Sequence, residues 1–122
     1  MKKKIFIITG EASGDKLAAD IVPYFSKSEY NILAIGSEKL KNKKIKLLFD
    51  SSTIAFMGIK DVILNIFHLK KKINFTIKSI VDFKPHVIFS IDAPDFAFRI
   101  ENEVKKKIPD IKVVHLVAPT IW

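Results

Sequence analysis

Two acidic residues, Asp92 and Asp95, have a spacing that suits acid–base chemistry. Carboxylates this close repel each other when both are charged, which raises the pKa of one and suits a general base. They follow an apolar run, 87–91, whose Val, Ile and Phe content predicts a strand buried on both faces. Pro94 cannot donate to a strand ladder, so we expect both carboxylates in a tight turn at the strand's end. Alternatively, one of them only caps the helix predicted to begin near Phe96.

A second candidate loop, Gly10-Glu11-Ala12-Ser13-Gly14-Asp15, follows another apolar run at 4–9. It matches neither the dinucleotide fingerprint nor the P-loop pattern. It could still direct backbone N–H groups and a helix N-terminus at an anionic or hydroxylated ligand. Alternatively, Gly10 and Gly14 serve only a tight turn, with Ser13 or Asp15 as a cap.

Strands and helices that alternate along the chain must position these loops. We expect strands at 4–9, 30–35, 45–49, 87–91 and 112–117, and helices after 15, near 37–42, at about 64–82 and at 96–107. This alternation predicts an α/β fold, a Rossmann-like three-layer sandwich with a mostly parallel sheet, in one domain, 1–122. In common doubly wound orders the first, fourth and fifth strands are neighbours, so the loops after them converge on one crevice.

The composition narrows the function classes. The net charge is +8, but Arg99 is the only arginine among 21 basic residues, which weakens a nucleic-acid-binding hypothesis. With no cysteine there are no disulfides or thiolate metal sites, and no other ligand spacing indicates a metal or cofactor. His115, inside an apolar run, is expected to be a satisfied core histidine. The apolar run after Met1 is too short for a signal peptide and no segment reaches transmembrane length, so we expect a cytosolic protein.

Residues 54–67 carry more apolar side chains than one helix face can hide. Together with nearby lysines they fit a patch that contacts lipid or a lipid-like substrate. The alternative is that they pack against a missing partner domain or fill the core. The chain also ends on an apolar Ile121-Trp122 pair soon after a predicted strand, so we expect the domain to be truncated at its C-terminus.

Four segments, in this order and at these separations, resemble lipid-A-disaccharide synthase, a member of glycosyltransferase family 19. They are Gly10 to Asp15, Met57-Gly58-Ile59 with Asp61-Val62, Ile91 to Phe96, and Ala118-Pro119-Thr120-Ile121-Trp122. The chain departs from the family's pattern at Ala118, Thr120 and Ile121, where many members carry serine and valine. The resemblance covers the whole chain but only the N-terminal part of the family's longer protein. It implies the N-terminal, acceptor-side half of a two-Rossmann-domain (GT-B) glycosyltransferase.

The resemblance also implies an activity: a metal-independent, UDP-sugar-dependent hexosyltransferase of lipid A and lipopolysaccharide biosynthesis. It would transfer 2,3-diacylglucosamine from UDP-2,3-diacylglucosamine to 2,3-diacylglucosamine 1-phosphate (lipid X), as a peripheral protein on the inner face of the cytoplasmic membrane. The donor half would belong to a longer product or to a separate partner chain, and the activity of 122 residues alone stays open. The alternative is a non-catalytic remnant or a module that binds lipid or an acylated sugar.

By the same resemblance, Asp95 is the general base and Asp92 orients it or binds substrate. The other implied substrate-binding residues are Gly10, Glu11, Ala12, Ser13, Gly14, Asp15, Met57, Gly58, Pro94 and Trp122. The implied contacts with acyl chains or membrane are Phe56, Ile59, Ile63 and Phe67.

Overall fold

A computed structural model of the chain describes residues 3–10, 12–25, 29–51, 62–91 and 94–116. Within these ranges, the side chains of residues 12–13, 62–66 and 94–95 are not described.

The centre of the molecule is a sheet of five strands, all parallel, in the order β3-β2-β1-β4-β5. The strands are β1 (Lys3–Thr9), β2 (Tyr30–Gly36), β3 (Lys46–Asp50), β4 (Val87–Ile91) and β5 (Lys112–Leu116). The first, fourth and fifth strands are therefore neighbours, which confirms the order expected from the sequence. The chain adds β2 and β3 on one side of β1 and then adds β4 and β5 on the other side of β1. The topological switch point therefore lies between β1 and β4.

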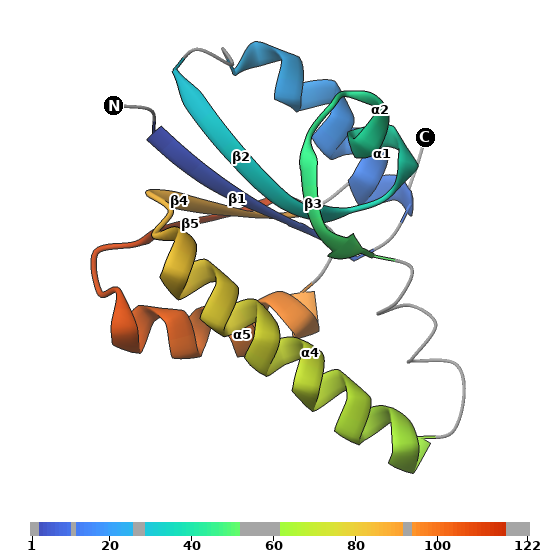
Figure 1. The fold of residues 1–122 in the computed structure, drawn as a ribbon, viewed down its shortest axis with the longest axis vertical. Coiled ribbons are helices and arrows are strands. Elements are labelled where there is room, and N and C mark those ends of the chain that lie inside the picture. Colours follow the sequence, from blue (N-terminus) through green and yellow to red (C-terminus); the bar gives the residue numbers. More distant parts are fainter. Residues whose placement is uncertain (1–2, 11, 26–28, 52–61, 92–93, 117–122) are drawn as a thin grey trace.

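Helices cover both faces of this sheet, as the prediction of a three-layer sandwich requires (Figure 1). They are α1 (Ala12–Ile21), the short 3-10 helix η1 (Val22–Tyr24), α2 (Glu38–Asn42), α4 (Val62–Phe83) and α5 (Pro94–Lys107). Helices α1 and α2 lie on one face, and α4 and α5 lie on the other. The Rossmann-like α/β architecture is confirmed.

Two apolar cores result, one on each face of the sheet. Successive residues of β1 alternate between them: Phe6 and Ile8 pack in the core under α4 and α5, whereas Ile5 and Ile7 pack in the core under α1 and α2. All four side chains are at most 1% exposed. A strand covered on both sides has no reason to alternate polar and apolar residues, which explains the continuous apolar run in β1.

Three helices begin earlier than the apolar periodicity predicts. Helix α1 starts at Ala12, so Gly14 and Asp15 lie in its first turns and not in a loop. Helix α5 starts at Pro94, so the predicted tight turn around Asp95 is wrong: its backbone belongs to the first turn of the helix. Proline is favoured at the first helical position because its missing N–H has no partner there anyway. Helix α4 starts at Val62, two residues before the expected Leu64.

Candidate functional site

The candidate site lies where β1, β4 and β5 end. The strand pairing places Thr9 beside Ile91, and Ile91 beside Leu116. The three neighbouring strands therefore end level with one another. The segments that follow are those singled out from the sequence, and their starting points converge on one edge of the sheet as expected. In open α/β sheets this carboxyl edge is where ligands bind.

Two helices also begin at this edge. Helix α1 starts two residues after Gly10, and α5 starts three residues after Ile91. The first turn of a helix has unpaired backbone N–H groups and a partial positive charge. The edge therefore carries two N-termini that favour an anionic group, such as a phosphate of a substrate.

Many of the predicted site residues lie outside the described residues. These are Glu11, Phe56, Met57, Gly58, Ile59, Asp92 and Trp122. For five others the structure gives the backbone, in a helix, but not the side chain: Ala12, Ser13, Ile63, Pro94 and Asp95. The remaining four are Gly10, which is half-buried after β1, Gly14 and Asp15, which are buried in α1, and Phe67, which is exposed on α4.

Asp15 is the one predicted site carboxylate whose contacts are described, and those contacts are internal. Its side chain is buried, with the residue 1% exposed. Oδ1 accepts a hydrogen bond from the backbone N–H of Ser37 at 2.7 Å, and Oδ2 accepts from Ser37 Oγ at 2.8 Å and from the N–H of Lys39 at 3.1 Å. Ser37 is the N-cap residue of α2. Asp15 therefore caps α2, and not its own helix, which fastens α1 to α2.

The end of β2 is built tightly around this carboxylate. A Cβ added to Gly36 would overlap the side chain of Leu40 in α2 and would lie 3.0 Å from Asp15 Oδ1. Beside it, the hydroxyl of Thr9 donates to the carbonyl of Ile35 at 2.8 Å and ties the end of β1 to β2. The sequence analysis missed this link, because the partners Asp15 and Ser37 are 22 residues apart. A ligand that binds Asp15 would have to share its oxygens with three internal donors.

A second polar pair, also missed from the sequence, joins α5 to β5. Glu101 is 5% exposed, and its Oε2 lies 3.2 Å from Nε2 of His115. The His115 ring also contacts Phe98, with 5.0 Å between ring centres. The expectation of a core histidine is wrong, because the His115 side chain is 39% exposed on an edge strand. The sequence feature that could have indicated this pair is Glu101 itself, a charged residue among the apolar positions Ile100 and Val104 of an amphipathic helix.

Burial is the main influence on the charge of Glu101. It raises the pKa of this carboxyl, and the nearby His115 and Lys105 oppose the rise by favouring the charged form. Its other oxygen, Oε1, is buried with no hydrogen-bond partner within the described part of the chain. The fold therefore favours a proton on Glu101 more than the unfolded chain does.

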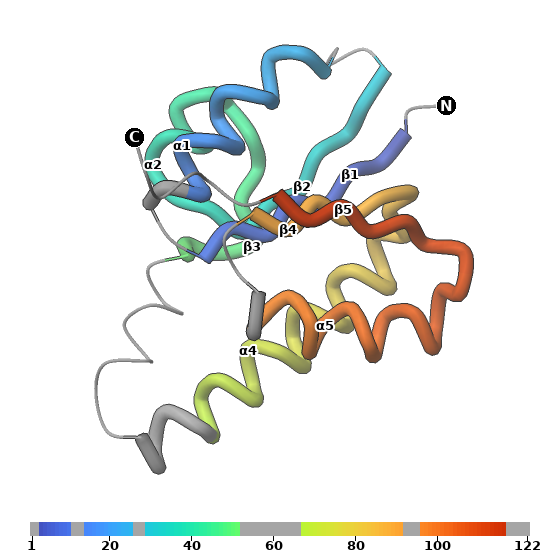
Figure 2. The backbone as a smooth tube through the Cα atoms, turned by 180° about the vertical axis from the view of Figure 1, so that it is seen from behind, coloured from blue at the N-terminus to red at the C-terminus, as the bar shows by residue number. Residues whose placement is uncertain are grey.

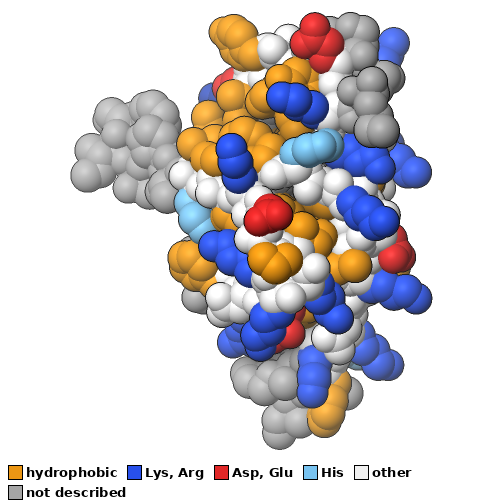
Figure 3. Space-filling view, turned by 90° about the vertical axis from the view of Figure 1, so that its left-hand side faces the viewer, with side chains coloured by type: hydrophobic (Ala, Val, Ile, Leu, Met, Phe, Trp, Pro, Cys, Tyr) orange, Lys and Arg blue, Asp and Glu red, His pale blue; other side chains and the backbone are white. Residues whose placement is uncertain are grey.

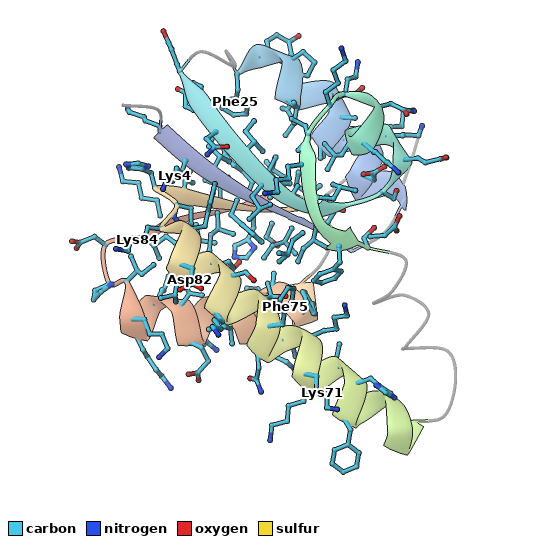
Figure 4. The ribbon with its side chains drawn as sticks, viewed as in Figure 1. Lys4, Phe25, Lys71, Phe75, Asp82 and Lys84 are labelled. Carbon is cyan, nitrogen blue, oxygen red and sulfur yellow. The ribbon has the colours of Figure 1, made fainter. Side chains whose placement is uncertain are left out.

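The first half of α4 projects beyond the sheet and past α5, as Figures 1 and 2 both show. Phe67, on this half, is 65% exposed. Further along the helix, Phe75 is 49% exposed (Figure 4). Lys72 Nζ lies 5.9 Å from the Phe75 ring centre and 4.4 Å from that of Phe49 in β3. Of the apolar residues predicted to form a patch in this region, Phe67 is the one whose side chain is described, and Lys70 and Lys71 beside it are exposed.

Two further findings concern membranes and metals. None of the described helices combines the length and apolar character needed to cross a bilayer. Within the described ranges, no three His, Asp or Glu side chains gather closely enough to hold a metal ion.

The fold and its carboxyl edge define a Rossmann-like α/β domain of the kind found in each half of a GT-B glycosyltransferase. A family model described as lipid-A-disaccharide synthetase matches residues 5–122. The chain belongs to this family.

Proteins named lipid-A-disaccharide synthase are similar to nearly the whole chain. Identity is 38% over 122 residues with that of Rickettsia bellii (strain OSU 85-389), 33% over 122 residues with that of Rickettsia typhi and 32% over 121 residues with that of Rickettsia felis. Each match covers 98% of this chain but only 31% or 32% of the relative. The chain thus spans about a third of the length of these curated relatives.

Replacing Asp15 tests its role as the cap of α2. We expect Asp15→Ala to lower the free energy of unfolding by about 1–3 kcal/mol, because two backbone N–H groups and the Ser37 hydroxyl lose a charged acceptor. Urea denaturation measures the change. Asp20→Ala, on the exposed side of the same helix, is the control and should change stability by less than about 0.5 kcal/mol. Equal stability of the two variants would contradict the capping role.

The Glu101 pair predicts a pH dependence of stability. Because the folded state holds this proton more tightly, unfolding releases it at pH values above 4.5, the ordinary pKa of the group, up to the raised pKa in the fold. The free energy of unfolding should therefore fall as pH rises through that interval, and Glu101→Gln should flatten the fall. Glu103→Gln is the matched control, since this exposed residue of α5 pairs with the exposed Lys106, at 3.1 Å. Parallel pH curves for the wild type and Glu101→Gln would show that Glu101 does not cause the dependence.

Proposed function

We propose that this chain is the acceptor-side domain of a glycosyltransferase that makes the disaccharide of lipid A. The supporting observation is the family match over residues 5–122, on a fold whose β1, β4 and β5 end side by side at a ligand-binding edge. The reaction transfers 2,3-diacylglucosamine from UDP-2,3-diacylglucosamine to lipid X. The two helix N-termini at this edge suit a phosphorylated acceptor.

The chemistry needs a base at the acceptor hydroxyl. As the hydroxyl oxygen bonds to the anomeric carbon, the bond from that carbon to UDP breaks, and its electron pair leaves with UDP. Asp95 takes the hydroxyl proton, and the neighbouring Asp92 orients Asp95 or holds the sugar. The segment Gly10 to Asp15, with Met57, Gly58, Pro94 and Trp122, lines the acceptor pocket. Asp95 lies in the first turn of α5, at the carboxyl edge of the sheet. This position supports its role as the base.

The donor contacts belong to polypeptide outside this segment. The relatives are about three times as long as this chain. A UDP-sugar also needs a binding surface opposite the acceptor. We expect the 122 residues to bind acceptor without turning it over, whether the donor half is part of a longer product or a separate chain.

The projecting half of α4 contacts the membrane that holds the acylated substrates. Phe67 inserts among the acyl chains, together with Phe56, Ile59 and Ile63, and the exposed Lys70 and Lys71 face anionic headgroups. The net charge of +8 adds to this attraction. We expect this contact to be made on the inner face of the cytoplasmic membrane.

A chimera tests the reaction and the base together. Residues 1–122 of this chain replace the matched residues of the Rickettsia bellii relative, and turnover of UDP-2,3-diacylglucosamine and lipid X is measured. We expect activity, and we expect Asp95→Asn to lower kcat roughly 10²- to 10⁴-fold with little change in KM. Asp20→Asn, on the exposed side of α1, is the control. A folded chimera without turnover would contradict the proposed function, whereas an Asp95→Asn rate within a few-fold of wild type would contradict only the base assignment.

Vesicle binding tests the membrane contact. We expect the 122-residue chain to bind vesicles that contain phosphatidylglycerol, with weaker binding at high salt. Phe67→Ser should weaken binding about tenfold, because one inserted aromatic side chain is lost. Tyr24→Ser is the control, since Tyr24 is 87% exposed but lies outside α4. Equal binding of both variants would place the membrane contact elsewhere.

A further inference from the structure

Helix α5 is held by different kinds of contact on its two sides. On the side of α4 the contact is apolar, since Ile80 of α4 packs in one core cluster with Ile100 and Val104 of α5. On the other side lies β5, the last strand of the described sheet, which Figure 2 shows nearest the viewer with α5 below it. Contacts between α5 and β5 therefore hold the helix on the side where the described sheet ends.

His115 is the residue of β5 that meets α5 nearest the carboxyl edge. Along β5, Val113 and His115 alternate with residues on the opposite face, so both point to the α5 side. Val113 packs against the apolar core. The His115 ring contacts two successive turns of α5: its centre lies 5.0 Å from that of Phe98, and its Nε2 lies 3.2 Å from Oε2 of Glu101. One side chain of β5 thus holds two turns of the helix.

These two turns directly follow the turn that carries the proposed base. Phe98 follows Asp95 by three residues, and Glu101 follows Phe98 by three more. Residues three apart are neighbours on the surface of a helix. With a rise of 1.5 Å per residue, the backbone of Asp95 lies about 9 Å along the helix from that of Glu101. The link to β5 therefore acts close to the first turn of α5.

Burial of Glu101 costs free energy. The residue is 5% exposed, and its Oε1 has no hydrogen-bond partner among the described residues. Removing a carboxylate from water can cost as much as its ion pair returns, so apolar side chains of similar volume can stabilise a fold equally well. A hydrogen bond is directional, however, and it fixes the rotation and the lengthwise position of the helix more closely than apolar packing does.

We propose that Glu101 and His115 are positioning residues for Asp95, which hold the first turn of α5 in place at the carboxyl edge. The proposal rests on the proposed function, in which Asp95 takes the proton of the acceptor hydroxyl. Neither Glu101 nor His115 contacts the substrate, and both act through the position of α5. A misplacement of about 1 Å at a reacting group can lower a rate roughly 100-fold, so a small shift of this turn matters.

The alternative role for the pair is stability alone. The two roles differ for a variant that keeps the packing and loses the hydrogen bond. Glu101→Leu is such a variant, because the leucine fills the buried space and the His115 side chain, which is 39% exposed, stays in contact with water. Its free energy of unfolding should be unchanged or higher. If the pair served stability alone, Glu101→Leu would keep the full rate of turnover.

Kinetics of the chimera with the Rickettsia bellii relative provide the first test. We expect Glu101→Leu to lower kcat about tenfold, with the KM for lipid X within about twofold of wild type, because the base is displaced and the acceptor contacts remain. Glu101→Gln should restore kcat to within about threefold, since its amide can still hydrogen-bond to His115. Glu103→Leu, an exposed position on the same helix, is the matched control and should leave both constants unchanged.

Hydrogen exchange in the 122-residue chain provides a test that needs no turnover. In an α-helix the amides of Phe98 and Arg99 donate to the carbonyls of Pro94 and Asp95, so their exchange reports on the first turn. We expect both amides to exchange at least tenfold faster in Glu101→Leu, whereas the amide of Val104 keeps its rate. The double variant Glu101→Leu/His115→Phe, in which a ring still faces Phe98, takes its place if Glu101→Leu does not fold.

Two results would overturn the proposal. One is a folded Glu101→Leu chimera whose kcat lies within twofold of wild type. The other is unchanged exchange at Phe98 and Arg99. A wild-type chimera without turnover contradicts the proposed function instead, and hydrogen exchange then decides whether the pair positions the first turn of α5.

Discussion

Parallel strands must be covered on both faces, and this constraint determines where the other parts of the chain lie. Each connection between two strands has to cross a face, so it becomes a helix that covers that face. The strand β1 is the centre of the arrangement: Phe6 and Ile8 hold one helical layer, and Ile5 and Ile7 hold the other. All carboxyl ends then meet at one edge, and the starting points of the candidate site segments gather there as a consequence of the core.

The same edge shows how acidic residues at the starts of two helices differ in their positions. Asp15 has three internal donors and a buried position, so its charge is already compensated by the N-terminus of α2. Asp95 differs in its position on the chain, because it lies in the first turn of α5, where the backbone N–H groups have no helical acceptor. Asp15 is therefore an internal cap, whereas the backbone of Asp95 lies at the edge where we propose that the acceptor binds.

Sequence patterns predicted the features that depend on local periodicity. The apolar runs identified all five strands, and a helix was expected at about 64–82, where Leu69, Ile73, Ile77 and Ile80 recur at helical spacing on the core side of α4. Helix starts were missed, because the first turn of a helix needs no apolar residue and looks like a loop. The pairs Asp15–Ser37 and Glu101–His115 were missed because they join separate elements through space. Of the candidate site, the convergence of strand ends was predictable, whereas the use of Asp15 as an internal cap was not.

The two exposed apolar regions lie at different places on the domain. The projecting half of α4 carries Phe67 beside lysines and extends away from the sheet. The second region is a hollow of about 570 Å³ at the amino ends of the strands, lined by Phe25, Phe89 and Lys112 among others, whereas the candidate site lies at their carboxyl ends. Figure 3 looks at the molecule from this side and shows hydrophobic side chains gathered next to lysines and a histidine. A five-residue strand such as β4 spans about 16 Å. The hollow is therefore separated by about the length of a strand from the carboxyl edge, where the backbone of Asp95 lies.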